Sequence, residues 1–110
     1  VSYGVPGRST LGAVRELRAQ GEKVGIIRPI TVWPFPAKAF AEAKGDIKGL
    51  ISVESTDAGQ LIEDVALTAK KTGHGNAPVY GLFSGQNIPK TKEIIEYFEG
   101  IKAGQMKEVF

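Results

Sequence analysis

The sequence contains no cysteine and only one histidine. Without cysteine, the chain cannot form disulfides, thiolate metal sites, cysteine nucleophiles or iron–sulfur ligands from its own residues. The histidine, His74, lies between Gly73 and Gly75, a setting that favours an exposed ring over one held for catalysis. One histidine and carboxylates mostly on predicted helix surfaces do not make a ligand cluster. The sequence therefore argues against a metal site in this chain.

The chain also has no large excess of charge of one sign. It contains 14 Lys and Arg and 12 Asp and Glu, for a net charge of +2. That balance gives no support for binding to nucleic acid or to an acidic membrane surface. No apolar run approaches the ~20 residues of a membrane helix, and no signal-peptide pattern opens the chain. We expect neither nucleic acid nor a membrane as a partner, and a cytoplasmic location.

Short apolar segments alternate with segments of helical spacing, which is the pattern of an α/β domain. At 110 residues the chain fits a single domain, 1–110. Its opening resembles the end of a buried strand, so we expect a fragment of a larger subunit. The predicted strands are Val1–Tyr3, Val24–Ile27, Leu50–Val53 and Val79–Leu82. Strands that alternate with helices favour a three-layer α/β/α sandwich, with a mainly parallel sheet of about five strands.

Four helices are predicted between and after these strands. The first has Ser9 or Thr10 as its cap, and the second begins at Pro36 and carries Phe40 inward. The third is the clearest, because apolar residues fall at i, i+4, i+7 and i+11: Ala58, Ile62, Val65 and Ala69. A fourth has Thr91 as its cap, and the residues after it, 102–110, are a possible docking tail.

The glycine-rich start invites a nucleotide-binding interpretation, which the residues do not support. Gly7 and Gly12 have P-loop spacing, but Ala13 and Val14 follow where Lys and Ser or Thr are needed. A turn into the first helix explains the glycines. A weaker possibility is an anion at this helix N-terminus near Arg8.

In open α/β sheets, ligands bind at the carboxyl edge of the strands, and two segments there stand out. Arg28-Pro-Ile-Thr-Val-Trp33-Pro-Phe35-Pro36 is stiffened by prolines and carries two aromatic rings, which suits an interface as well as it suits a covered sheet edge. Glu54 ends a predicted buried strand and needs a partner, for which Arg28 is the candidate. Asp57 is explained by helix capping.

These segments resemble a known family. Gly21-Glu-Lys-Val-Gly-Ile-Ile-Arg28-Pro-Ile-Thr-Val-Trp33-Pro-Phe35-Pro36 is followed by Val53-Glu54 and then by Gly59-Gln60-Leu-Ile-Glu-Asp64-Val. This closely resembles the transketolase-C-like domain (core domain II) of the α-type subunit of 2-oxoacid:ferredoxin oxidoreductases, nearer to the 2-oxoisovalerate and 2-oxoglutarate types. The family often has Tyr-Gly-Thr-x-Ala-Arg at the first turn, whereas this chain has Tyr3-Gly4-Val5-Pro6-Gly7-Arg8.

The resemblance implies an enzyme complex that decarboxylates a 2-oxoacid on thiamine diphosphate and magnesium. Iron–sulfur clusters pass the electrons to ferredoxin, and CoA takes the acyl group. The implied neighbours are the pyrimidine-binding domain of the same subunit and the pyrophosphate-binding and iron–sulfur subunits. This domain would be an inactive organiser with no catalytic and no cofactor-binding residue. Its interface or structural candidates are Arg28, Trp33, Phe35, Glu54 and Gln60.

Two other functions are compatible with the sequence. One is the equivalent domain of another thiamine enzyme: transketolase, deoxyxylulose-phosphate synthase or the β-type subunit of a 2-oxoacid dehydrogenase. The other is a free-standing flavodoxin-like module that binds a small anion, which predicts a sizeable pocket at the carboxyl edge of the strands.

Overall fold

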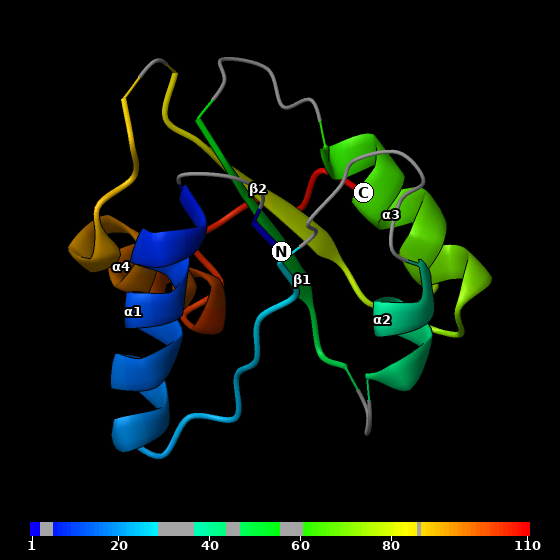
Figure 1. The fold of residues 1–110 in the computed structure, drawn as a ribbon, viewed down its shortest axis with the longest axis horizontal. Helices are drawn as coiled ribbons and strands as arrows, with labels where there is room; N and C mark the ends of the chain where they lie inside the picture. The colour runs from blue at the N-terminus through cyan, green and yellow to red at the C-terminus, as the bar shows by residue number, and fades with distance from the viewer. Residues whose placement is uncertain (3–5, 29–36, 44–46, 56–60, 86) are drawn as a thin grey trace.

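A computed structural model (Figure 1) describes the chain except residues 3–5, 29–36, 44–46, 56–60 and 86. Its elements in chain order are α1 (Pro6–Ala19), α2 (Ala37–Glu42), β1 (Leu50–Glu54), α3 (Ile62–Lys71), β2 (Val79–Phe83) and α4 (Thr91–Lys102). Helices α1 and α4 lie together on one side of the strands, and α2 and α3 lie on the other (Figure 1). The predicted mixed α/β domain is confirmed at this level.

The two strands pair in parallel, with Leu50 opposite Val79 and Glu54 opposite Phe83. Backbone hydrogen bonds continue sideways from this pair in both directions. On the β1 side, Ser2 forms a parallel bridge with Val53, and its N–H donates to Ile27 O at 3.1 Å. On the β2 side, residues 109 and 110 bond to Val79. Five chain segments therefore lie side by side, and among the described residues two of them, β1 and β2, form a ladder.

The prediction of a strand at Val24–Ile27 is wrong, since none of these residues is part of a strand. Among the described residues, the segment joins the sheet through the bond from Ser2 N–H to Ile27 O. The predicted strand Val1–Tyr3 is reduced to the single bridge of Ser2, and Tyr3 lies outside the described residues. An apolar run predicts burial but not hydrogen bonding to a neighbour on both sides.

Each face of the sheet has its own apolar cluster. Toward α2 and α3, the buried residues are Phe40, Leu61, Ile62, Val65 and Val79. Toward α1 and α4, they are Ala13, Val53 and Ile94. Alternate residues of β1 serve the two clusters, because successive side chains of a strand point to opposite faces. Helices thus cover both faces of a sheet of which two strands are described.

Helix α1 begins earlier than the sequence predicts. Ser9 and Thr10 do not cap it, because it starts at Pro6, and Thr10 Oγ1 donates to Pro6 O at 2.9 Å inside the helix. Proline suits a first helical position, where its missing N–H is not needed. The end of the helix agrees with the sequence, since Gly21 has φ of 90° just beyond it.

Helix α2 does carry Phe40 inward, and this side chain is only 1% exposed. The predicted start of α2 at Pro36, and Ala58 and Asp57 ahead of α3, lie outside the described residues. The prediction of Thr91 as the cap of α4 is wrong, because Thr91 is already its first residue and Lys90 is the N-cap. The N–H of Lys90 donates to the carboxylate of Glu93 at 3.4 Å.

A buried carboxylate at the end of β1

Glu54 ends β1 on the face that packs against α3, and it is 7% exposed. One carboxylate oxygen accepts the Ser52 hydroxyl at 2.9 Å, and the other accepts the backbone N–H of Leu61 at 2.7 Å. Leu61 is the N-cap residue of α3 and has no side-chain cap of its own. Glu54 therefore supplies from the strand the acceptor that helix N-termini require.

The segment 1–2 passes close to this carboxylate. The Val1 amino group donates to Ile51 O at 2.5 Å, and the Ser2 hydroxyl, fully buried, donates to Val53 O at 3.1 Å. Burial lowers the pKa of the Val1 amino group from 8.0 to about 5, and the charge of Glu54 opposes this shift. Burial is thus the larger effect at this position.

The two arginines of the candidate site lie at the start of α1. Arg28 is exposed, and a Cβ placed on Gly7 would come within 2.6 Å of its Nε, so its guanidinium group lies against the first turn of α1. Arg8 is exposed in the same turn. The contacts that can be described for Glu54 are those with Ser52 and Leu61, and its pairing with Arg28 stays a prediction.

The aromatic half of the predicted site, Trp33 and Phe35, lies outside the described residues, as does Gln60. Of the predicted site residues, the structure therefore describes Glu54, Arg28 and Arg8. Of these three, Glu54 is buried in hydrogen bonds within its own chain, while both arginines present charge to solvent.

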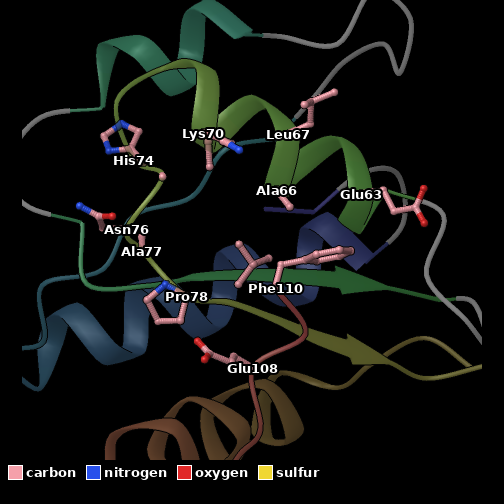
Figure 2. A pocket seen from close by; sticks show the side chains of 13 residues that line it. Glu63, Ala66, Leu67, Lys70, His74, Asn76, Ala77, Pro78, Glu108 and Phe110 are labelled. Carbon is pink, nitrogen blue, oxygen red and sulfur yellow. The ribbon is translucent and has the colours of Figure 1, made fainter.

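A hollow in the described part of the molecule lies at the opposite end of β2, away from the carboxyl edge. Figure 2 shows this open groove of about 670 Å³ between α3, the turn before β2, and the tail. Its floor is mostly apolar, and its charged residues are Glu63, Lys70 and Glu108. The Nε2 atom of His74, which also lines this groove, lies 3.0 Å from Phe40 O.

Two side-chain contacts with the backbone, made by His74 and Tyr97, were not predicted from the sequence. His74 was predicted to be an exposed ring between glycines, but it is half-buried and ties the turn after α3 to α2. Tyr97 of α4 donates its hydroxyl to Gly81 O at 2.9 Å, and burial raises its pKa. Neither partner is close in sequence, so no local pattern could have indicated them.

The thiamine and magnesium chemistry that the resemblance implies does not fit the donors described here. Among the described residues, no group of three or more His, Asp or Glu side chains comes together as a metal site requires. Glu54, the buried carboxylate among the described residues, accepts two hydrogen bonds from its own chain.

Replacing Glu54 with alanine should lower the free energy of unfolding by about 2–3 kcal/mol, because it leaves the Leu61 N–H and the Ser52 hydroxyl without their acceptor. Glu54→Gln keeps an acceptor of the same shape and should cost about 1 kcal/mol. Urea denaturation of the chain measures both. The matched control is Glu63→Ala, an exposed carboxylate in the first turn of α3, which should cost at most about 0.5 kcal/mol. Equal losses for Glu54→Ala and Glu63→Ala would show that Glu54 does not cap α3.

Comparison with known proteins gives relatives that are much longer than this chain. It is 41% identical over 69 residues to the ketoisovalerate oxidoreductase subunit VorB of Methanothermobacter marburgensis, covering 63% of the chain and 19% of the relative. It is 32% identical over 102 residues to the 2-oxoglutarate synthase subunit KorA of the same organism, covering 93% of the chain and 26% of the relative. The chain thus spans about a fifth to a quarter of the relatives that it matches. No solved structure matches it.

No helix in the described part of the chain has the length and apolar character needed to cross a membrane. A comparison with protein families also gives a match over most of the chain. Residues 1–94 match the family model described as pyruvate:ferredoxin oxidoreductase core domain II. This supports the domain of 2-oxoacid:ferredoxin oxidoreductase subunits over the two alternative functions that the sequence left open. The chain belongs to the pyruvate:ferredoxin oxidoreductase core domain II family.

Proposed function

We propose that this chain is a noncatalytic organising domain of a 2-oxoacid:ferredoxin oxidoreductase subunit. The observation that carries the proposal is the family match over residues 1–94. The geometry of Glu54 supports it, because the one buried carboxylate described in the sheet is used to join β1 to α3. A site residue would instead direct an acceptor toward a ligand.

The enzyme to which the domain contributes would oxidatively decarboxylate a 2-oxoacid to an acyl-CoA and reduce ferredoxin. The names of the relatives, ketoisovalerate oxidoreductase and 2-oxoglutarate synthase, support a 2-oxoacid of one of these two classes. Thiamine diphosphate, magnesium, iron–sulfur clusters and CoA would be held by other parts of a cytoplasmic complex. The partners of this domain would be the pyrimidine-binding domain of its own subunit and the pyrophosphate-binding and iron–sulfur subunits.

Within that complex we propose a single domain, 1–110, with the three-layer sandwich of transketolase C-terminal domains and a sheet of about five strands. The five segments joined by backbone hydrogen bonds, and the helices on both sides of the strands, support this architecture. Residues that would contact neighbouring domains are Arg28, Trp33, Phe35 and Gln60, with Glu54 in a structural role. Arg8 and the tail 102–110 would be secondary contacts.

The proposal is tested by assaying 2-oxoacid-dependent reduction of an artificial electron acceptor, with thiamine diphosphate, magnesium and CoA present. The purified chain should give no turnover, and a complete oxidoreductase containing it should give full turnover. Turnover by the purified chain would overturn the noncatalytic role. Activity of the complete enzyme that does not depend on any 2-oxoacid would overturn the reaction class.

The interface is tested in the complete enzyme by Arg28→Ala, because Arg28 is exposed in the domain alone. Loss of a charged contact at a docked surface should weaken co-purification of the other subunits severalfold. Arg15→Ala is the matched control, since Arg15 is an exposed arginine of α1 away from the first turn. Equal assembly in the two variants would remove Arg28 from the interface.

A further inference from the structure

Two arginines at the start of α1 lie where positive charge is least favourable. Arg8 is the third residue of α1, whose first turn contains no acidic residue. The guanidinium group of Arg28 lies against the same turn, because a Cβ on Gly7 would come within 2.6 Å of its Nε and 3.1 Å of its Cζ. The N-terminus of a helix carries partial positive charge, so cations in its first turn lower the stability of the helix. The stability of α1 therefore does not explain these two residues.

Gly7 provides the space in which the guanidinium group of Arg28 lies. Gly7 is buried in α1, and a side chain at this position would overlap the Nε atom of Arg28. Glycine is also a poorer helix former than alanine. The glycine and the charge beside it both disfavour α1, and both place the same guanidinium group at its first turn.

The start of α4 extends this charged surface. Thr91 Oγ1 donates to Ser9 O at 3.1 Å, so the first turns of α1 and α4 are in contact, and the two helices lie together in Figure 1. Lys90, which precedes Thr91, is exposed, and the carboxylate near it is that of Glu93, which accepts the N–H of Lys90. Ile88, two residues before Lys90, is 52% exposed. The described surface at these two helix starts is therefore mainly cationic, and Ile88 adds an exposed apolar side chain.

Exposed guanidinium groups on an open surface favour a protein partner over a small ion. Arg8 and Arg28 are both exposed, whereas a small ligand is held by polar groups that converge in an enclosed pocket. A guanidinium group binds a carboxylate through two parallel hydrogen bonds, which an ammonium group cannot do. Arginine is enriched at protein interfaces, and the buried centres of these interfaces are apolar. The complementary surface is one that carries Asp or Glu side chains.

We propose that Arg8 and Arg28 bind carboxylate side chains of a partner subunit, that Gly7 positions Arg28 for this contact, and that Ile88 packs at its margin. The cations that disfavour α1 in the free domain are then neutralised in the complex. This inference rests on the proposed function, because it requires a complex in which the domain docks. It adds to that function the chemistry of the partner surface, which is acidic.

The docking is tested in the complete oxidoreductase by co-purification of the other subunits over a range of salt concentrations. Reversing both charges, with Arg8→Glu and Arg28→Glu, should weaken co-purification about tenfold and remove most of its dependence on salt. Lys70→Glu with Lys71→Glu is the matched control, because these exposed lysines lie in the last turn of α3, on the other side of the strands. The control changes the net charge equally and should assemble as the unchanged enzyme does.

A second pair of variants tests the positioning role of Gly7. In Gly7→Ala the new Cβ displaces the guanidinium group of Arg28, so co-purification should fall severalfold although no charge is changed. Ser9→Ala is the control, since it also favours helix in the first turn of α1 and leaves the space beside Gly7 open. It should assemble normally.

The stability of the purified chain distinguishes docking from a role in the fold. Urea denaturation should show equal or higher midpoints for Gly7→Ala and for the doubly reversed variant, because alanine favours helix and glutamate suits a helix N-terminus. Lower midpoints in these variants would show that the arginines and Gly7 stabilise the fold, and would overturn the proposal.

Unchanged assembly of the doubly reversed variant would overturn the docking site, and equal assembly of Gly7→Ala and Ser9→Ala would overturn the positioning role. Calorimetry with inorganic phosphate tests the small-ion alternative. If the purified chain binds phosphate and the reversed variant does not, the arginines form a small-anion site, and the docking proposal is wrong. The proposed function fails by a separate result, which is that the assembled, unchanged enzyme shows no 2-oxoacid-dependent turnover.

Discussion

Replacing Phe40 with alanine should lower the free energy of unfolding by about 3–5 kcal/mol. Phe40 is 1% exposed and packs in the apolar cluster formed with Leu61, Ile62, Val65 and Val79. It is also the one buried residue of α2, which has only six residues. Helices this short do not persist in water without tertiary contacts. The substitution therefore removes a large buried ring and releases α2 from α3.

Urea denaturation measures the loss, and amide hydrogen exchange of α2 reports its release. The control is Lys38→Ala in the same helix. Lys38 pairs with Glu42 at 3.8 Å, but both side chains are largely exposed, so the change should stay within about 0.5 kcal/mol. A domain of this size has a free energy of unfolding of about 5–15 kcal/mol, so the loss for Phe40→Ala should be a large, measurable fraction of it. A loss as small as that of Lys38→Ala would show that α2 is not anchored by Phe40.

The helices show where sequence patterns were informative. The apolar spacing of Ile62, Val65 and Ala69 predicted α3, and these three residues are buried in it. The start of α1 was misjudged at Thr10, because a threonine hydroxyl can cap a helix or bond the carbonyl four residues earlier. Here it bonds Pro6 O. Spacing records which face is buried, but the choice between two local hydrogen bonds depends on where the chain enters the helix.

The sheet was harder to predict, because strand pairing joins residues that are distant in the chain. The apolar segment at Val24–Ile27 lies beside Ser2 but forms no ladder. The bonds between Val79 and residues 109–110 have no counterpart in the sequence pattern, since nothing local marks a tail as the neighbour of a particular strand. The parallel pair of β1 and β2 was predictable because a helix of suitable length connects them.

In the candidate site, too, the sequence indicated a residue but not the long-range contact that this residue makes. Glu54 stood out because a carboxylate at the end of a buried strand requires a partner. One partner in the structure is the backbone N–H of Leu61, seven residues later, while the expected pairing with the cation of Arg28 stays a prediction. A backbone partner carries no residue type that a sequence could display. The position was therefore predictable, and this backbone partner was not.

In a 110-residue polypeptide with a free amino group at Val1, lowering the pH from 8 to 5 should destabilise the fold through that group. In the folded chain, burial lowers the pKa of this group from 8.0 to about 5. Between these two values the unfolded chain binds a proton that the folded chain does not, so the free energy of unfolding falls as the pH falls. Over the whole interval the loss amounts to about 4 kcal/mol at most. Above pH 8 the group is neutral in both states, and this contribution to the pH dependence disappears.

The chain with an N-acetyl group on Val1 is the control. Acetylation keeps an N–H that can donate to Ile51 O but removes the titration. All carboxylates and His74 are shared by the two forms, so their contributions cancel in the difference. Urea denaturation at several pH values should show the two stabilities diverging as the pH falls through this interval, with the acetylated form the more stable at pH 5. Parallel pH profiles would mean that the amino group is hydrated in the folded chain, and that the segment 1–2 does not lie buried beside β1.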